Sequence, residues 1–293
     1  MKSKRIVRVM SAALSVMLLS AAPDMTACAA AVLTPEASGT TTYGNSKTTI
    51  DASHTSDGYI MIKYNGSNPK VKIRIRKDTE YTYDLNSSGN YETFPLSDGS
   101  GAYSIKLYEN VSGNDYILAS SETVPVSLSN ETRPFLYPNQ FCNFNAGSAV
   151  VSTSDSITAG LNDPLLKLEA VYNYTINNIS YDTAKAASVT SGYLPDVDAT
   201  LSSKSGICFD FASLMTAMLR AQQIPTKLVI GYAGDVYHAW VSIYVDGQGW
   251  VDNIIYFDGS TWTMMDPTYA SSKSAEANSF ITNPANYHAK FTY

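Results

Sequence analysis

Alternating apolar and polar residues dominate the chain between residues 59 and 120, a pattern typical of half-buried β-strands. Residues 59–64 and 71–76 alternate most cleanly, and Asn65-Gly66 between them is a turn signal. Further strands are expected at residues 79–85, 91–96, 102–109 and 116–120, separated by clusters rich in Ser, Asn, Asp and Gly. Short strands with regularly spaced turns predict an antiparallel β-sandwich.

Helical spacing replaces this alternation in the second half of the chain. Asp163-Pro164 predicts a helix start, with Asp163 as the N-cap. Apolar residues then recur at intervals of three and four, at Leu165, Leu168, Tyr172, Ile176 and Ile179. We expect an amphipathic helix here, followed over residues 180–203 by a loop that is either a plain surface connection or a substrate-facing segment.

A second helix is expected to begin near residue 207. Ser205 is a candidate N-cap, and Gly206 permits an unusual backbone angle. Strands are expected afterwards at residues 226–232, 238–245, 249–251 and 262–266. Helices followed by an antiparallel sheet predict an α+β domain. The apolar face of the helix is formed by Ile207, Phe211, Leu214, Met215, Met218 and Leu219.

These patterns divide the 293 residues into five segments. We expect a signal peptide over residues 1–30, a flexible lead over 31–54 and the β-sandwich over 55–130. Residues 131–160 are expected to form a linker and the start of the core, and residues 161–293 the α+β domain. No catalytic motif falls in the sandwich segment, so a spacer, adhesion or substrate-presenting role is its default interpretation.

The signal-peptide prediction depends on the first thirty residues. Four basic residues stand within the first eight positions, and residues 9–22 form an apolar run too short to span a bilayer. Ala27-Cys28-Ala29 fits a cleavage site, so the first interpretation is a secreted, extracellular protein. The alternative is a lipid anchor at Cys28 on the outer face of the cytoplasmic membrane, although the surrounding residues match a lipobox poorly. No later segment predicts a transmembrane span.

The charge of the chain bears on its partners. Removing the leader takes away four basic residues and one acidic one, which changes the formal charge from −6 to −9. Such an acidic surface argues against nucleic acid and anionic membranes as partners. We expect a protein or peptide substrate, with cell-wall peptide as one option.

Cysteine usage leaves two thiols to assign, because Cys28 belongs to the leader. In an exported protein, Cys142 and Cys208 suggest a disulfide, and such a bond would prevent Cys208 from acting as a nucleophile. No group of cysteines and histidines has the spacing of a metal site, so we expect neither a metal nor another cofactor.

Cys208 stands in the first turn of its predicted helix. Unpaired N–H groups and the positive end of the helix dipole favour a thiolate there, although a small buried hydrophobe is the alternative interpretation. A nucleophilic cysteine needs a base and a group that orients the base. Among the three histidines, His238 opens a strand of the same domain, whereas His54 precedes the sandwich and His288 lies in the tail. Asp266 ends a later strand that is able to neighbour His238.

Three blocks of residues together resemble a known family. Ser205-Gly206-Ile207-Cys208 with Phe211-Ala212, then His238-Ala239-Trp240, then Asp266-Pro267-Thr268 are similar, in this order, to the motifs of the transglutaminase-like superfamily. The resemblance covers about residues 161–272, is strongest to the bacterial secreted branch, and implies a papain-like fold for the α+β domain. It implies nothing for residues 32–130.

The resemblance implies a Cys208–His238–Asp266 triad. The thiolate would attack an amide carbonyl and form a thioester, His238 would protonate the leaving amine, and Asp266 would orient the imidazole. The Cys208 N–H is a candidate oxyanion donor. Candidates for the second donor are Tyr172, Tyr174 and Gln140, and Trp240 is either a wall of the cleft or a core residue.

The sequence therefore predicts a secreted thiol-dependent acyl-transfer enzyme, most simply a peptidase or amidase. A protein-cross-linking transglutaminase and an inactive adhesin or binding scaffold are the alternatives. Animal members of the family use calcium, but no acidic loop here has the spacing of calcium ligands, so we expect activity in chelator.

Overall fold

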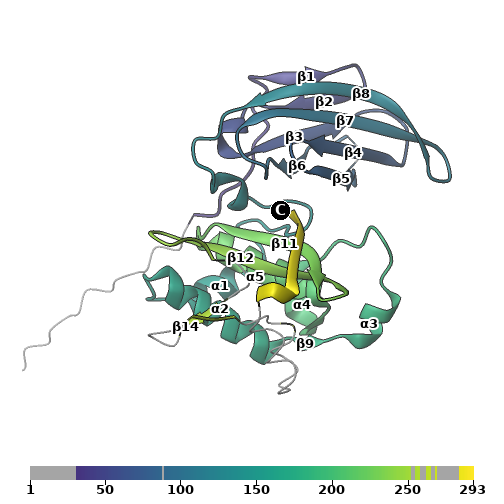
Figure 1. Ribbon diagram of the computed structural model, residues 1–293. Coiled ribbons are helices and arrows are strands. Elements are labelled where there is room, and N and C mark those ends of the chain that lie inside the picture. Colours follow the sequence, from purple (N-terminus) through teal and green to yellow (C-terminus); the bar gives the residue numbers. More distant parts are fainter. Residues whose placement is uncertain (1–30, 88, 252–254, 258–261, 265–267, 269–283) are drawn as a thin grey trace, which may run out of the picture.

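A β-sandwich and an α+β part make up the computed structural model, which describes residues 31–87, 89–251, 255–257, 262–264, 268 and 284–293. Figure 1 shows the sandwich lying over the helices and the sheet of the second part. The predicted α+β class is confirmed. The predicted signal peptide lies outside the described residues. Among the residues described, no helix has the length and apolar character needed to cross a bilayer.

Two antiparallel four-stranded sheets form the sandwich. One has the strand order β1 (Thr42–Gly44), β2 (Thr48–Asp51), β3 (Tyr59–Tyr64), β6 (Glu92–Pro95), and the other has the order β5 (Glu80–Asp84), β4 (Val71–Arg76), β7 (Gly101–Ser112), β8 (Asp115–Val126). The bounds of β3 and β4 are the ones predicted from the alternation. The pattern is clear in these strands because their isoleucine side chains face one core. Ile60 and Ile62 of β3 and Ile73 and Ile75 of β4 are at most 1% exposed.

Three details of the sandwich were not given by the sequence pattern. Asn65-Gly66 joins strands of opposite sheets, so it marks a corner and not a hairpin. β1 and β2 fall within residues 31–54, where composition predicted a flexible lead; Ile50 of β2, which is fully buried, ties this segment to the core. His54, just before β3, lies beside Asp57 (Nδ1 to Oδ2, 3.3 Å) and stacks on Tyr59.

The second part combines helices with an antiparallel sheet. Its sheet has the order β13 (Gly249–Val251), β12 (Val236–Val245), β11 (Thr226–Ala233), β16 (Tyr287–Thr292). Short pairs are formed by β9 (Ser180–Tyr181) with β10 (Ser205–Gly206), and by β14 (Ile255–Phe257) with β15 (Trp262–Met264). The helices are α1 (Ala149–Ile157), α2 (Pro164–Asn178), α3 (Thr183–Ser188), α4 (Val197–Ser203) and α5 (Cys208–Ala221).

Helix α5 is the centre of this part. It packs against α1, α2 and α4 on one side and against β11 and β12 on the other. Every residue from 210 to 221 is buried. The predicted apolar face is therefore only part of the buried surface, because small residues such as Ala212, Ser213 and Ala217 let neighbouring elements approach the remaining faces.

The start of α2 was predicted correctly, because its capping aspartate is followed directly by a proline. Asp163 caps α2 by accepting a hydrogen bond from the Leu165 N–H at 2.8 Å, as expected. Residues 180–203 were predicted to form a loop, but they contain α3 and α4, capped in the same way by Asp182 and Asp196. Ser205 was wrongly predicted as the N-cap of α5, because it lies in β10 and Ile207 occupies the cap position.

Arg220, near the end of α5, is fully buried. Its guanidinium donates to the main-chain oxygens of Tyr137, Thr226 and Tyr293 at 2.5 to 3.0 Å. It also donates to the Cys142 sulfur at 3.2 Å. Burial lowers the pKa of Arg220. One side chain thus holds the segment before α1, the start of β11 and the residue after β16 against the same helix.

Arg220→Met is expected to lower the free energy of unfolding by roughly 3 kcal/mol, because buried main-chain oxygens lose their donor. Urea unfolding followed by circular dichroism measures this. The control is Arg74→Met on an exposed position of β4, expected to change stability by less than about 0.5 kcal/mol. Equal midpoints for the two variants would contradict the role of Arg220.

Candidate active site

Cys208 is the first residue of α5 and is partly exposed. Ile207 before it is extended (φ −95°, ψ 176°), so the chain turns directly from β10 into the helix. A helix of 14 residues directs unpaired N–H groups and the positive end of its dipole at its first turn. This is a location where a thiolate is stabilised.

Asp210 organises the first turn of α5, although its side chain is fully buried. Its carboxylate accepts hydrogen bonds from the Ile207 N–H at 2.8 Å, from Lys185 Nζ at 2.6 Å and from the Tyr193 hydroxyl. Lys185 Nζ also donates to the Tyr193 hydroxyl at 2.7 Å. The carboxylate therefore fixes α3 and the segment after it to the residues beside Cys208.

The pKa values of the two partners follow from this network. Burial alone would lower the pKa of Lys185, but its hydrogen bonds to Asp210 and Tyr193 prevail and raise it. Burial raises the pKa of Tyr193, and the hydrogen bond to the Asp210 carboxylate acts in the same direction. Lys185 therefore stays charged and Tyr193 stays protonated across the physiological range.

Gly206 is required for a steric reason and not for a backbone angle. A Cβ on this residue would stand 2.6 Å from Asp210 Cβ and 3.0 Å from Asp210 Oδ2. Its φ is not positive, so the prediction of an unusual angle is wrong. The Gly-x-Cys-x-Asp spacing follows, because the glycine leaves room for the carboxylate that closes the turn.

His238 lies on β12 and is only 4% exposed. Strand pairing places it opposite Gly231 and gives it the same face as Trp240 and Tyr287, whose rings it approaches at centroid distances of 6.2 and 6.4 Å. Ala239 and Val241 point the other way, into the core that contains α5. Tyr237 directly precedes His238 in β12. Its pKa is raised by burial and also by the charges of Tyr232 and Cys208.

The other predicted site residues have mixed positions. Asp266 lies outside the described residues. Trp240 is 4% exposed and clusters with Val229, Ala233 and Tyr287, as a core residue does. Tyr172 is buried in α2 and Tyr174 on the same helix is partly exposed. Gln140 is partly exposed in the segment before α1, where its Nε2 lies 3.5 Å from the Asp84 oxygen.

Both described cysteines are free thiols, so the disulfide alternative does not hold. Cys142 is fully buried, and burial raises the pKa of its thiol more than the neighbouring Arg220 lowers it. Within the described ranges, no three His, Cys, Asp or Glu side chains are grouped to hold a metal ion.

Sequence reasoning missed Asp210, Lys185, Tyr193 and strand β16. The signal for Asp210 was present, since an aspartate at the third position of a helix commonly closes a capping interaction. Lys185 and Tyr193 gave no signal, because a partner 25 or 17 residues away is set by the fold. His288, expected in a tail, lies in β16 opposite Tyr232.

The helices, the sheet and the cysteine at the start of α5 define an α+β domain of the papain-like class. Residues 151–267 match the sequence model of the transglutaminase-like superfamily, and this part of the chain is a transglutaminase-like core domain. The family predicted from the three motifs is thereby confirmed. The matched segment includes Cys208, His238 and Asp266.

Three known proteins show distant similarity to the chain. YebA, an uncharacterized protein of Bacillus subtilis (strain 168), is 24% identical over 220 residues, which is 61% of this chain and 30% of YebA. The chain thus spans less than a third of that relative. A proposed cysteine protease from Cytophaga hutchinsonii is 16% identical, covers 86% of this chain and 84% of its own, and has a TM-score of 0.41. The periplasmic domain of TgpA from Pseudomonas aeruginosa is 15% identical, with 81% and 98% covered and a TM-score of 0.37.

Gly206→Ala is expected to lower the free energy of unfolding by about 1 to 3 kcal/mol, because the new methyl group displaces the Asp210 carboxylate. Thermal unfolding measures the loss. The control is Gly147→Ala, whose Cβ would meet only the Asn145 side chain at 3.2 Å and which should be close to neutral. If Gly206→Ala were as stable as this control, the steric explanation would fail.

Proposed function

We propose that this protein is a thiol-dependent acyl-transfer enzyme that attacks amide bonds with Cys208. The observation that carries the proposal is the position of this thiol, which is partly exposed at the first turn of an otherwise buried helix. It stands within the segment that matches the transglutaminase-like superfamily. The thiolate adds to the carbonyl carbon, the amine leaves with a proton, and the resulting thioester is cleaved by water.

His238 is the proposed base and Asp266 the group that orients it, as the family motifs imply. The strand register puts His238 on the same face as Trp240, opposite to Ala239 and the core that contains α5, so this assignment rests on the family motifs and not on the register. His288 has Tyr232 as its register partner and so shares a face with Tyr237, which feels the charge of Cys208. His288 is therefore the natural control for His238.

The side chains near Cys208 favour a peptide with an apolar or aromatic residue beside the cleaved amide. Phe209 packs against Tyr193 and Phe141 at centroid distances of 6.3 and 5.7 Å. Tyr232 and Tyr237 are 41% and 56% exposed and contact each other edge-on at 5.5 Å. Hydrolysis is the proposed outcome; incorporation of an amine in preference to water would instead indicate a cross-linking enzyme.

Export is part of the proposal. It is supported by the basic start, the short apolar run and the small residues around residue 28. The mature protein would act outside the cytoplasm on protein or peptide, including cell-wall peptide, either free or held by a lipid at Cys28.

Cys208→Ala is expected to abolish cleavage of any peptide amide found by screening a peptide library with the purified chain. His238→Gln should lower kcat/KM by about 100-fold or more, because proton transfer in the transition state is lost. His288→Gln should leave the rate unchanged. Equal losses in the two histidine variants would contradict the assignment of His238.

Iodoacetamide labelling tests the thiol without a substrate. At neutral pH, Cys208 is expected to react faster than free cysteine, because the helix N-terminus favours the thiolate. Cys142, which is fully buried, should stay unmodified in the same sample, and peptide mapping separates the two sites. A Cys208 that reacts no faster than free cysteine would count against the nucleophile.

A further inference from the structure

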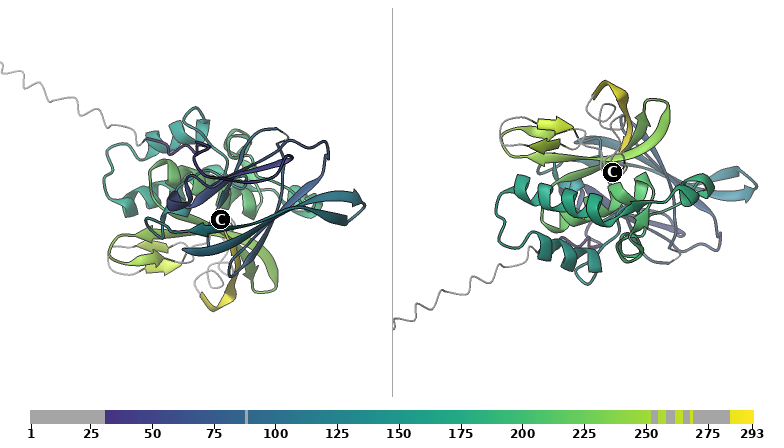
Figure 2. Two further views of the ribbon diagram at one scale, coloured as in Figure 1. Left: turned by 90° about the horizontal axis from the view of Figure 1, so that it is seen from above. Right: turned by 90° about the horizontal axis from the view of Figure 1, so that it is seen from below.

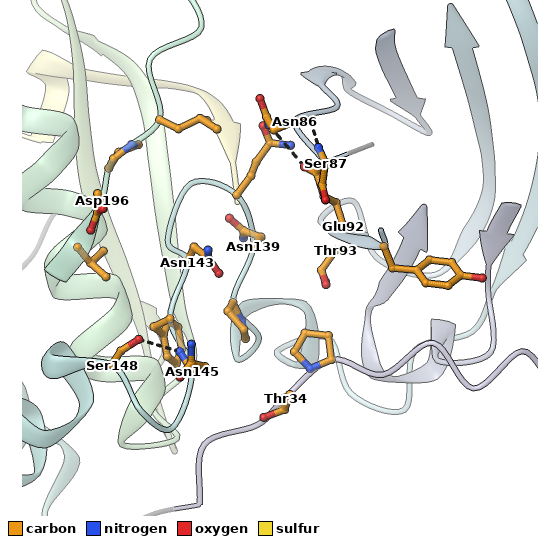
Figure 3. A pocket seen from close by; sticks show the side chains of 18 of the residues that line it. Thr34, Asn86, Ser87, Glu92, Thr93, Asn139, Asn143, Asn145, Ser148 and Asp196 are labelled. Atoms are coloured by element: carbon orange, nitrogen blue, oxygen red, sulfur yellow. Dashed lines mark hydrogen bonds between the residues drawn. The ribbon is translucent and has the colours of Figure 1, made fainter. Parts of the chain in front are cut away.

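A cavity of about 690 Å³ lies between the sandwich and the α+β part. One wall comes from β3, β6 and the turn before β6, and the other from residues 138–148 and 194–198. Figure 3 shows Thr93 on one side of the space, with Asn139 and Asn143 on the other. Neither Cys208 nor His238 lines it. Its size is that of a small-molecule site, and such sites commonly form where two domains meet.

Hydrogen bonds fix the walls of this cavity in advance. Glu92 accepts from the Asn86 and Ser87 N–H groups, which shapes the turn before β6. Asp198 accepts from the first N–H groups of α1 at 3.1 and 2.8 Å, which holds α4 against α1. The segment around Asn139 rests on α5, because Ser213 donates to the Phe141 oxygen at 2.7 Å. A ligand would therefore meet a site whose shape already exists.

The charges around the cavity exclude an anionic ligand. None of the lining residues is Lys, Arg or His, and three are carboxylates. These carboxylates already accept main-chain hydrogen bonds, so they are only partly available to a cation. Burial raises the pKa of Glu92, although its hydrogen bonds from Ser87 and Asn86 act in the opposite direction.

The remaining polar lining consists of amides and hydroxyls. Thr34, Thr93, Gln140 and Asn143 present donors and acceptors together. Asn139 is 5% exposed; its Oδ1 accepts from the Phe141 N–H, and its Nδ2 has no partner among the residues that the structure describes. Proline, aliphatic and aromatic side chains also line the cavity, among them Pro35, Leu194 and Phe144. Sugar hydroxyls both donate and accept, and sugar rings pack their C–H faces against such apolar surfaces.

A peptide strand fits this cavity less well than a sugar does. β6 is at the edge of its sheet, so a peptide would bind by extending that edge. The Leu96 N–H donates to the Gly58 oxygen. Because main-chain groups alternate along the strand, the main-chain groups of Thr93 and Pro95 point away from β3, toward the open edge. Pro95 has no N–H, so the edge offers a single outward donor.

We propose that this cavity binds an uncharged carbohydrate. The wall segments continue into residues that contact the first turn of α5: Tyr193, next to the lining residue Leu194, bonds to Asp210, and Phe141, next to the lining residue Gln140, packs on Phe209. A bound sugar would thus lie beside the segments that surround Cys208. The inference concerns binding alone and does not require Cys208 to be catalytic.

Calorimetric titration of the purified chain tests the proposal with matched trisaccharides. The neutral probes are tri-N-acetylchitotriose and maltotriose, the cationic probe is chitotriose, the anionic probe is trigalacturonate, and an uncharged tripeptide amide represents peptides. Saturable binding of at least one neutral sugar, with no binding of trigalacturonate, is the expected result. Absence of binding by both neutral sugars, or tighter binding of the tripeptide or of the cationic probe, would overturn the proposal.

Variants locate the binding. Asn143→Ala and Thr93→Val should each weaken the neutral sugar by about three- to tenfold, which corresponds to one lost hydrogen bond. Asn143→Trp, at an exposed position, should fill the space and abolish binding. Asn173→Ala and Thr82→Val are the controls, because both residues are exposed and neither lines the cavity. Unchanged affinity in Asn143→Trp would show that the sugar binds elsewhere.

Discussion

Burial of α5 is the constraint on which the rest of the second part depends. A helix surrounded on all sides must have the polar groups of both ends satisfied by other parts of the chain. Asp210 in its first turn and Arg220 in its last turn are both fully buried. The negative charge of Asp210 lies at the positive end of the helix dipole, and the positive charge of Arg220 lies at its negative end. Asp210 accepts hydrogen bonds from Lys185 and Tyr193, and Arg220 donates hydrogen bonds to main-chain oxygens of three separate segments. The helix that presents Cys208 is thereby fixed in position at both ends.

An aromatic cluster joins the sandwich to this helix. Tyr81 and Tyr83 of β5 contact Tyr293 at centroid distances of 5.5 and 5.9 Å, and Tyr83 also reaches Phe141 at 5.8 Å. Phe141 packs in turn on Phe209, the neighbour of Cys208. In Figure 1 the C-terminal residue lies between the two parts, and the two views of Figure 2 show the sandwich strands extending beyond the helices. The sandwich is therefore connected through Phe141 to Phe209, the residue next to the proposed nucleophile.

The sequence predicted correctly those elements whose bounds depend on neighbouring residues alone. The alternation of residues 59–64 and 71–76 gave strands with correct bounds, and Asp163-Pro164 gave a correct helix start. The three motifs gave the family of residues 151–267. What failed depends on distant contacts. Ile50 holds β2 only because a sandwich core exists to receive it, and β16 is a strand because β11 offers it an edge. The side on which His238 lies is set by register, which no single stretch of sequence reveals. The cavity is likewise invisible in the sequence, since its walls come from segments far apart in the chain.

The contacts of Arg220 also constrain the order of events during synthesis. Its acceptors lie 83 residues before it and 73 residues after it. While the chain is still emerging from the ribosome, α5 carries a guanidinium that must stay hydrated until β16 has been made and docked. Contacts of such sequence separation slow folding, because a long loop must close before they form. The α+β part is thus expected to consolidate only after residue 293 has been synthesised and is free to dock.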